Sequence, residues 1–385
     1  MLFNWLLLSS KNTKPHTAKM KKEQKIKVGI SLGDLNGIGP EVVLKTFAEA
    51  MMLDFCTPVI IGSVKVLNQI RKELDVELSL HGIDAFAKAL EGKVNVLNIW
   101  KENISVEPGV ETAEAGKYAL ESFLTGVDAL KNEEIDALVT APINKANIQT
   151  EAFKFPGHTD YLAQELTGDA MMLMVSESLK VGLLTDHVAV KEISGKITPE
   201  LITKKIETLY VTLQRDFGIG KPKIALLGIN PHVGDNGVIG DEDDKVLIPT
   251  LEKIRATGKV VYGPYAADSF FGSGNYKNFD AVLAAYHDQG LIPFKTLAFG
   301  KGVNYTAGLN KIRTSPDHGT GYDIAGKGDA DHSSFREAVF TAVNIYKHRS
   351  EYDVLTENVL KVSPRKPGGR GRSRNEGGRK YDKNS

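Results

Sequence analysis

The chain has 385 residues, of which 42% are apolar and 25% are charged, a composition typical of a soluble globular protein rather than a disordered or fibrous one. Its 48 basic and 48 acidic residues give a formal net charge of zero, so bulk charge does not predict binding to nucleic acid or to an anionic membrane. The single cysteine, Cys56, excludes an intrachain disulfide and favours a reducing, cytoplasmic compartment. We expect it to be a buried thiol rather than a nucleophile.

Residues 1–24 are expected to be an extension outside the folded body. The apolar run at residues 2–8 is short, no basic residue precedes it, and no small-residue cleavage site follows. It therefore lacks the features of a secretory signal peptide, and Met20 is an alternative start to Met1. No stretch approaches the ~20 apolar residues of a membrane-spanning helix, so we expect no membrane segment.

Strand and helix patterns then alternate from Ile26 to about Tyr346, which predicts an α/β fold. A strand at 26–32 runs into a glycine-rich turn at 33–39, and Pro40 begins a helix that continues to about Ala50. Further strands are predicted at 59–61, 94–99 and 137–140, and a long amphipathic helix at 112–131. With ~150 residues per domain, the length suggests two domains.

Three later strands each end near a histidine. His187 follows the strand at 181–185, His232 follows the strand at 224–228, and His287 follows the strand at 281–286. Ligands of open α/β sheets bind at the carboxyl ends of strands, so these side chains can converge. Three neutral imidazoles can bind a divalent cation and leave positions open for substrate oxygens. Each histidine alone is more typical of a hydrogen-bonded loop residue than of a metal ligand, but the repeated placement at strand ends makes a shared metal site an equal alternative.

Two other groups of residues are candidates for binding an anion. His158, Thr159 and Asp160 precede a predicted helix, so backbone N–H groups and the Thr159 hydroxyl can face a phosphate at its N-terminus. The alternative is an ordinary helix cap formed by Thr159 or Asp160. Around the strand at 303–306, three side chains supply the charges and donors that a phosphate or carboxylate needs: Lys295, Asn304 and Arg313.

A dinucleotide site is suggested by residues 317–326 rather than by the first glycine-rich turn. The spacing of glycines in 33–39 does not match G-x-G-x-x-G, so no Rossmann domain is predicted. The run Asp-His-Gly-Thr-Gly-Tyr-Asp-Ile-Ala-Gly at 317–326 is similar to the stretch that binds the adenosine part of the cofactor in isocitrate and isopropylmalate dehydrogenases. This resemblance implies that His318, Gly319 and Thr320 bind the cofactor.

Taken in order from about Lys25 to Lys347, the motifs resemble those of the 4-hydroxythreonine-4-phosphate dehydrogenase family of vitamin B6 biosynthesis. The matching stretches are 33–41, Gly157-His158-Thr159-Asp160, Asn230-Pro231-His232, Tyr286-His287-Asp288-Gln289-Gly290, 299–304 and 313–320. One departure is Asn144, which stands where some members carry histidine.

The resemblance implies a fold like that of isocitrate and isopropylmalate dehydrogenases, in which residues 25–350 form two interleaved α/β subdomains with a cleft between them. It also implies a homodimer with the active site at the subunit interface, NAD or NADP, and one divalent zinc, magnesium or cobalt ion. It implies oxidation of 4-phosphooxy-L-threonine to a 3-keto acid that loses its carboxylate. Lys295 either transfers a proton or only binds the phosphate. The residues implied are metal ligands His187, His232 and His287, substrate-binding His158, Thr159, Lys295, Asn304 and Arg313, and the active-site Asp268.

Three alternatives remain open from the sequence. Related enzymes act on threonate or erythronate 4-phosphate, and phosphate acyltransferases of related fold need no histidine trio. The third alternative is RNA binding through the tail at 363–385, which is rich in glycine and arginine. That tail is expected to be disordered and simply solvated, which makes a nucleic-acid partner the weaker expectation.

Overall fold

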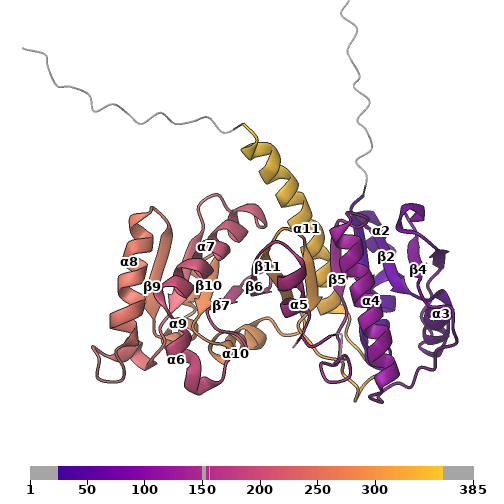
Figure 1. Cartoon of the computed structure of the whole chain (residues 1–385), viewed down its shortest axis with the longest axis horizontal. Helices are drawn as coiled ribbons and strands as arrows, with labels where there is room; N and C mark the ends of the chain where they lie inside the picture. Colours follow the sequence, from indigo (N-terminus) through magenta and orange to yellow (C-terminus); the bar gives the residue numbers. More distant parts are fainter. Residues whose placement is uncertain (1–24, 150–152, 156, 359–385) are drawn as a thin grey trace, which may run out of the picture.

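A computed structural model describes residues 25–149, 153–155 and 157–358. The predicted N-terminal extension and the basic tail lie outside these residues. Within the described residues the chain forms one sheet covered by helices on both faces (Figure 1). The helices are α1 (Gly39–Ala48), α2 (Met52–Phe55), α3 (Val64–Glu73), α4 (Ala113–Lys131), α5 (His158–Glu165), α6 (Ile193–Lys196), α7 (Pro199–Arg215), α8 (Ile248–Ala256), α9 (Ala267–Gly272), α10 (His287–Leu297) and α11 (Ser333–Thr356).

The sheet of the described residues has twelve strands in the order β3-β4-β2-β1-β5-β12-β11-β6-β7-β10-β8-β9. In chain order they are β1 (Lys27–Ser31), β2 (Thr57–Gly62), β3 (Leu80–Ile83), β4 (Val94–Asn98), β5 (Ala137–Thr140), β6 (Gly168–Val175), β7 (Lys180–Leu183), β8 (Lys223–Leu227), β9 (Val260–Tyr265), β10 (Ala281–Ala284), β11 (Val303–Leu309) and β12 (Arg313–Pro316).

The direction of the strands changes at the centre of the sheet. The strands from β3 to β12 are parallel to one another, and so are the strands from β7 to β9. Between these groups β11 pairs antiparallel with β12 and β6, and β6 pairs antiparallel with β7. The two parallel groups therefore run in opposite directions, and the sheet is not the all-parallel sheet of a Rossmann domain.

The hydrophobic core differs between the two faces of the sheet. On one face, apolar side chains of α1, α7, α8 and α11 form a single continuous cluster. On the other face there are two clusters, one with side chains of α4 and α5 and one with side chains of α9 and α10. Figure 1 shows α4 and α10 in opposite halves of the molecule. The second face is thus interrupted above the central strands, where a ligand can enter.

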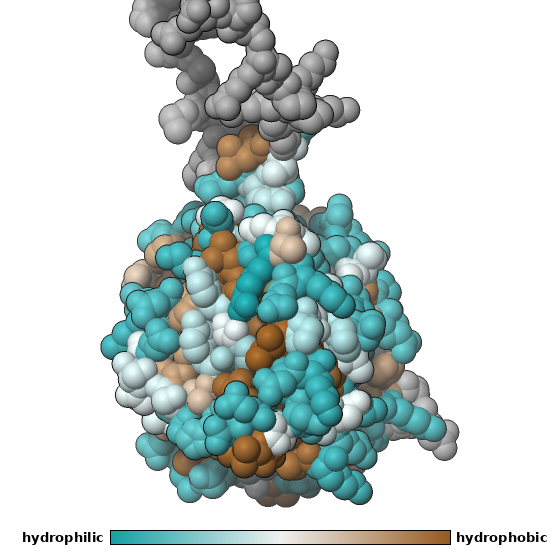
Figure 2. Space-filling view, turned by 90° about the vertical axis from the view of Figure 1, so that its left-hand side faces the viewer, coloured by the Kyte–Doolittle hydropathy of each residue, from teal (hydrophilic) through white to brown (hydrophobic). Residues whose placement is uncertain are grey.

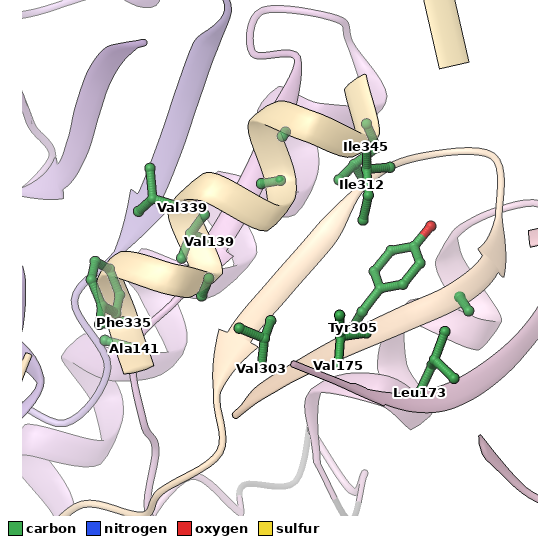
Figure 3. Close-up of a cluster of buried hydrophobic side chains, with 14 of the residues drawn as sticks. Val139, Ala141, Leu173, Val175, Val303, Tyr305, Ile312, Phe335, Val339 and Ile345 are labelled. Carbon is green, nitrogen blue, oxygen red and sulfur yellow. The ribbon is translucent and has the colours of Figure 1, made fainter. Parts of the chain in front are cut away.

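Helix α11 packs on the uninterrupted face across the centre of the sheet. Its Phe335, Val339 and Ile345 belong to one buried cluster with Val303 and Tyr305 of β11, and Figure 3 shows Phe335 beside Ala141 and Val339 beside Val139. These side chains are at most 1% exposed. Because α11 contacts β5, β12 and β11, it covers the junction between the first parallel group and the central antiparallel strands.

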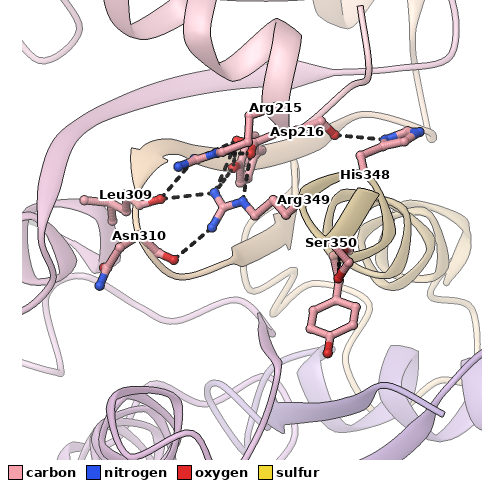
Figure 4. A network of polar contacts seen from close by, with 9 residues as sticks. Arg215, Asp216, Leu309, Asn310, His348, Arg349 and Ser350 are labelled. Carbon is pink, nitrogen blue, oxygen red and sulfur yellow. Dashed lines mark hydrogen bonds and ion pairs between the residues drawn. The ribbon is translucent and has the colours of Figure 1, made fainter. Parts of the chain in front are cut away.

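A buried ionic network fixes the end of this packing. Asp216, which is fully buried, binds Nε of Arg215 and of Arg349 at 2.7 Å each (Figure 4). The Tyr305 hydroxyl donates to the same carboxylate at 2.5 Å. Burial alone would raise the pKa of Asp216, but the two guanidinium groups hold it below the usual range. The network ties the end of α7 to β11 and α11, and removing one partner would leave buried charge uncompensated.

The predicted elements agree with the structure, and the α/β class is confirmed. The strand predicted at 137–140 coincides with β5, and the helix predicted at 112–131 is α4, where the Thr112 side chain caps the helix by accepting from Ala115 N at 3.1 Å. No helix among the described residues has the length and hydrophobicity needed to span a membrane. The boundaries of two subdomains stay a prediction, because a single sheet runs through both halves.

Candidate active site

A cavity of about 270 Å³ lies above the central strands, on the face where the core is interrupted. The loops that follow β5 and β12 form one side of it, and His187, His287 and α10 form the other. Although the two parallel groups run in opposite directions, residues that follow strands of both groups line this one cavity. Side chains of β6, β11 and β12 line it from the sheet: Met172, Met174, Asn304, Arg313 and Ser315.

Arg313 is the main charge of this cavity. Its guanidinium is buried and donates to Oγ1 of Thr140 at 2.6 Å and to Oγ1 of Thr306 at 3.3 Å. No carboxylate of the described residues forms an ion pair with it. Burial lowers the pKa of Arg313 to about 9, so the side chain remains charged at neutral pH. A buried cation without a counter-ion is costly, which favours an anionic ligand at this position.

His158 completes the anion site from the start of α5. Its Nδ1 lies 2.8 Å from Nη2 of Arg313, and its Nε2 is buried without a partner. Burial lowers the pKa of His158 well below 6.5, and the nearby charges of Arg313 and Lys145 act in the same direction. The ring is therefore neutral. Because Arg313 can only donate, Nδ1 accepts and the proton lies on Nε2, where it can be donated to a ligand.

The structure places Thr159 at this cavity and excludes the alternative of a Thr159 or Asp160 cap. Helix α5 begins at His158, its cap residue is Gly157, and no side chain caps it. Thr159 and Asp160 lie in the first turn and line the cavity. Oδ1 of Asn304 is also buried without a partner. All five predicted substrate-binding residues thus border one cavity: His158, Thr159, Lys295, Asn304 and Arg313.

The three predicted metal histidines are brought to neighbouring positions but not to one point. The rings of His187 and His287 have centroids 6.2 Å apart, and both line the cavity. His232 lines an adjacent cavity of about 310 Å³ together with Tyr286 and Gln289, which flank His287 along the chain. No group of three His, Cys, Asp or Glu side chains among the described residues is already arranged to hold a metal. The histidine trio stays a prediction.

Hydrogen bonds hold the three histidine loops side by side. The Thr185 hydroxyl donates to Ala285 O at 2.8 Å and so joins the end of β7 to the end of β10. Gln289 accepts from Ala285 N and donates to Gly228 O, each at 2.7 Å, which joins β10 to β8. Neither Thr185 nor Gln289 could be assigned this role from the sequence, because the role depends on strand order.

The turn that carries His232 is strained and tied down. His232 and Val233 have φ values of 53° and 59°, and a positive φ is a genuine outlier for a β-branched residue. Asp243, which is fully buried, accepts from the backbone nitrogens of Ile229 at 2.8 Å and Asn230 at 2.9 Å. Strain held by surrounding structure is common at functional positions. Asp243 was missed from the sequence because it lies in an acidic run typical of a solvated loop.

The two predicted catalytic residues lie in different cavities. Lys295 lines the cavity of His158 and Arg313, and its Nζ donates to Asp317 O at 3.2 Å. Asp268, near the start of α9, lines the cavity of His232. Within one chain the structure therefore does not bring Asp268 and Lys295 into the same site.

Of the three predicted cofactor residues, His318 and Gly319 line the main cavity and Thr320 does not. Nδ1 of His318 donates to Gly319 O at 3.1 Å, and its Nε2 is buried without a partner. The carbonyl of Thr320 instead accepts from Ile38 N at 2.8 Å.

Cys56 has the properties of a structural cysteine rather than a nucleophile. Burial raises the pKa of its thiol to about 12, so the reactive thiolate does not form at neutral pH.

A protein-family model for "Pyridoxal phosphate biosynthetic protein PdxA" matches residues 54–342, a range that includes every candidate residue described above. The chain belongs to the PdxA family. The resemblance identified from its motifs is therefore confirmed, and with it the prediction of an oxidoreductase.

Members of the PdxA family carry two related names. A 4-hydroxythreonine-4-phosphate dehydrogenase of Bacteroides thetaiotaomicron is 46% identical over 342 residues, which cover 88% of this chain and 94% of that protein. A D-threonate 4-phosphate dehydrogenase of Cupriavidus necator is 40% identical and covers 84% of this chain and 98% of that protein. The crystal structure of 4-hydroxythreonine-4-phosphate dehydrogenase from Klebsiella pneumoniae superposes with a TM-score of 0.72 at 35% identity, over 84% of this chain and 98% of that one.

Proposed function

We propose that the chain oxidises 4-phosphooxy-L-threonine with NAD⁺ or NADP⁺ to 2-amino-3-oxo-4-phosphooxybutanoate, which loses CO₂ to give 3-amino-2-oxopropyl phosphate. The substrate loses a hydride from its secondary alcohol carbon and a proton from its hydroxyl. The nicotinamide ring accepts the hydride. The role would be in pyridoxal phosphate biosynthesis, in keeping with the family.

The observation that supports this proposal most directly is the buried, unpaired guanidinium of Arg313 beside neutral His158. Together they offer donors to a phosphate group at one end of the cavity. Thr159 and Asn304 border the same space. A phosphate bound there would offset the charge of Arg313 and accept from His158 Nε2, in the charge-assisted geometry that favours phosphate recognition.

At the other end of the cavity, His187 and His287 fit a divalent metal. With metal–nitrogen bonds of ~2.1 Å, two coordinating rings have centroids ~5–6 Å apart, close to the separation observed. Asp288 Oδ1 lies 2.7 Å from His287 Nδ1, a second contact of the kind that orients ligand histidines. We propose His232 as the third ligand. A divalent ion supplies Lewis-acid stabilisation of the negative charge that develops on substrate oxygens.

Lys295 lies on the α10 wall, between the histidine end of the cavity and the loop that carries His318. Its contact with Asp317 O fixes Nζ near the position of the substrate. We assign it either proton transfer or phosphate binding, as its sequence context implies. His318 and Gly319 would contact the dinucleotide from the opposite wall, and Thr320 would contribute through the loop it anchors.

A second copy of the chain would complete the site. Large apolar side chains close in sequence to the candidate metal histidines are strongly exposed: Val190 is 80% exposed, Val238 81%, Ile292 64% and Phe299 90%. Figure 2 shows the end of the molecule with α8 and β9 as mainly hydrophilic, with apolar side chains gathered in a strip and at its lower edge. Exposed apolar groups beside a site favour a subunit interface. We propose a homodimer that acts in the cytoplasm, in which Asp268 reaches the site of the partner subunit.

The related D-threonate 4-phosphate is the second candidate substrate, because a relative of that name is nearly as similar as those of the first name. Both molecules carry the phosphate that Arg313 would bind. They differ next to the carboxylate, where 4-phosphooxy-L-threonine has an amino group and D-threonate 4-phosphate has a hydroxyl group. Purified protein should be assayed with each substrate and NAD⁺ or NADP⁺, with Zn²⁺, Mg²⁺ or Co²⁺ added. Reduced cofactor from 4-phosphooxy-L-threonine at a higher kcat/KM than from D-threonate 4-phosphate supports the proposal, and the reverse order replaces it with the second candidate.

A further inference from the structure

The glycine-rich turn at 33–39 has no role in the chemistry described so far. It follows β1, whose carboxyl end lies beside that of β5, and β12 is the next parallel strand of the sheet. The turn does not line the main cavity, whereas the loops after β5 and β12 do. We refer to these three segments as the 33–39, 141–147 and 318–326 loops.

The carboxylate of Asp34 joins the three loops. Its Oδ2 accepts from the Tyr322 hydroxyl at 2.8 Å and from Nδ2 of Asn147 at 2.7 Å, and its Oδ1 accepts from Asn36 N at 2.9 Å. Nδ2 of Asn144 donates to the Tyr322 hydroxyl at 3.2 Å. Asp34 is fully buried. A buried carboxylate held by three donors makes strong, charge-assisted hydrogen bonds.

Burial raises the pKa of Tyr322 to about 12, with the Asp34 carboxylate adding to this effect. The phenol therefore stays protonated and donates to Asp34 across the physiological range. The hydroxyl can therefore act as the donor to Asp34 at neutral pH.

The backbone of the 33–39 loop is in direct contact with both other loops. Asp34 N donates to Pro142 O at 2.9 Å, and Ile38 N donates to Thr320 O at 2.8 Å. A Cβ added to Gly33 would lie 2.2 Å from Pro142 O, and one added to Gly37 would lie 2.7 Å from Thr320 O. The glycines are therefore needed for this close approach, which explains the glycine pattern without a phosphate-binding role.

We propose that Asp34 is a positioning residue that fixes the 318–326 loop relative to the 141–147 loop and thereby sets the affinity of the cavity for the nicotinamide dinucleotide. The inference rests on the proposed function, since it takes His318 and Gly319 as dinucleotide contacts. Residues of the 141–147 loop and of the 318–326 loop line the same cavity side by side. A small shift between them would change how the dinucleotide fits while leaving Arg313 and the histidines in place.

The test compares Tyr322→Phe with Tyr118→Phe. Tyr118 is a matched control, because its hydroxyl also donates to a carboxylate, Oε1 of Glu102 at 3.2 Å, but away from the cavity. Loss of one such hydrogen bond should raise the KM for the dinucleotide, and the Kd for NADH measured by fluorescence, about fivefold or more. The KM for the phosphorylated substrate, kcat at saturating dinucleotide and bound metal should stay within about twofold. Asp34→Asn should change the same quantities in the same direction.

Equal effects of Tyr322→Phe and Tyr118→Phe on dinucleotide affinity would overturn the proposal, as would a loss of thermal stability with unchanged dinucleotide KM. If Asp34→Asn fails to fold, Tyr322→Phe decides alone, since it leaves the contacts of Asp34 with Asn147 and Asn36 intact. Failure of the proposed function is a separate result: the unaltered, folded chain would then show no NADH binding and no turnover.

Discussion

Nη2 of Arg313 lies 2.8 Å from Nδ1 of His158, and no carboxylate of the described residues forms a hydrogen bond or an ion pair with either side chain. Two nitrogen groups at this distance require one of them to accept, and only the imidazole can. The pair is therefore a charged donor beside a neutral ring whose remaining N–H is free. This pair destabilises the protein without a ligand and favours the binding of an anion. Both the stability of the fold and the affinity for the phosphorylated substrate should therefore depend on it.

Replacing Arg313 by methionine should separate folding from ligand binding. The buried, unpaired charge disappears, so the melting temperature without ligand should not fall. The KM for the phosphorylated substrate should rise about 100-fold, and inorganic phosphate should no longer raise the melting temperature. Arg336→Gln is the control, because Arg336 pairs with Glu49 at 2.6 Å outside the cavity. A variant that phosphate still stabilises would show that the anion binds elsewhere.

The neutral state of His158 predicts how stability depends on pH. Burial, and after it the charge of Arg313, lowers the pKa of the folded ring well below 6.5, so below pH 6.5 the unfolded chain binds a proton that the folded chain does not. The stabilisation by neutral His158 is thus complete above pH 6.5 and is lost as the pH falls. The free energy of unfolding should decline by up to ~1.4 kcal/mol per pH unit.

Denaturant unfolding of the unaltered chain and of His158→Gln, measured at several pH values without ligand, checks this expectation. The difference in unfolding free energy between the two proteins should be constant above pH 6.5 and shift in favour of the variant below it. Parallel curves down to pH 5 would mean that the folded ring is protonated as readily as the unfolded one.

Removal of the histidines tests the metal site one ligand at a time. His187→Ala and His287→Ala should each abolish bound metal and turnover, because their rings lie 6.2 Å apart at the cavity. His232→Ala should do the same if the trio binds one ion. Metal per chain is measured by elemental analysis together with NADH formation. His348→Ala is the control, since that ring bonds Asp216 O away from the cavity.

Two results would separate the possible ligand sets. Full metal content in His232→Ala, with loss of metal in the other two variants, would mean that His232 is not a ligand. His187 and His287 would then bind the metal together with other side chains. Unchanged metal in all three variants would remove the metal site from this cavity.

Much of the site could be predicted from the sequence because its residues follow recognisable strands. His187, His232 and His287 were found as residues that follow apolar runs, and a parallel sheet brings such positions to its carboxyl edge. What the sequence did not reveal is that β7, β8 and β10 run opposite to β5 and β12. The pairing of β11 and β6 decides this, and no local pattern encodes which strands become neighbours.

The contacts that hold the site were harder to predict than the residues that face the ligand. Gln289 and Asp243 bond backbone groups of distant loops, and Asp34 meets Tyr322 across 288 positions. Such contacts depend on three-dimensional packing, while their sequence context is that of ordinary turns. The spacing of glycines at 33–39 correctly predicted that the fold is not a Rossmann domain, yet only the structure shows which backbone atoms approach this turn.

The close approach of the loops after β1 and β5 requires a glycine at position 33. Gly33 and Gly92 have φ values of 65° and 71°, so alanine at either position adopts an unfavourable left-handed backbone at a cost of ~1–2 kcal/mol. A Cβ at Gly92 meets nothing within 4 Å, whereas one at Gly33 lies 2.2 Å from Pro142 O. Gly33→Ala should therefore lower the free energy of unfolding by ~3 kcal/mol or more, and Gly92→Ala by ~1 kcal/mol. Urea unfolding of both variants measures the difference. Equal losses would show that the loops after β1 and β5 separate readily, which would also weaken the role assigned to Asp34.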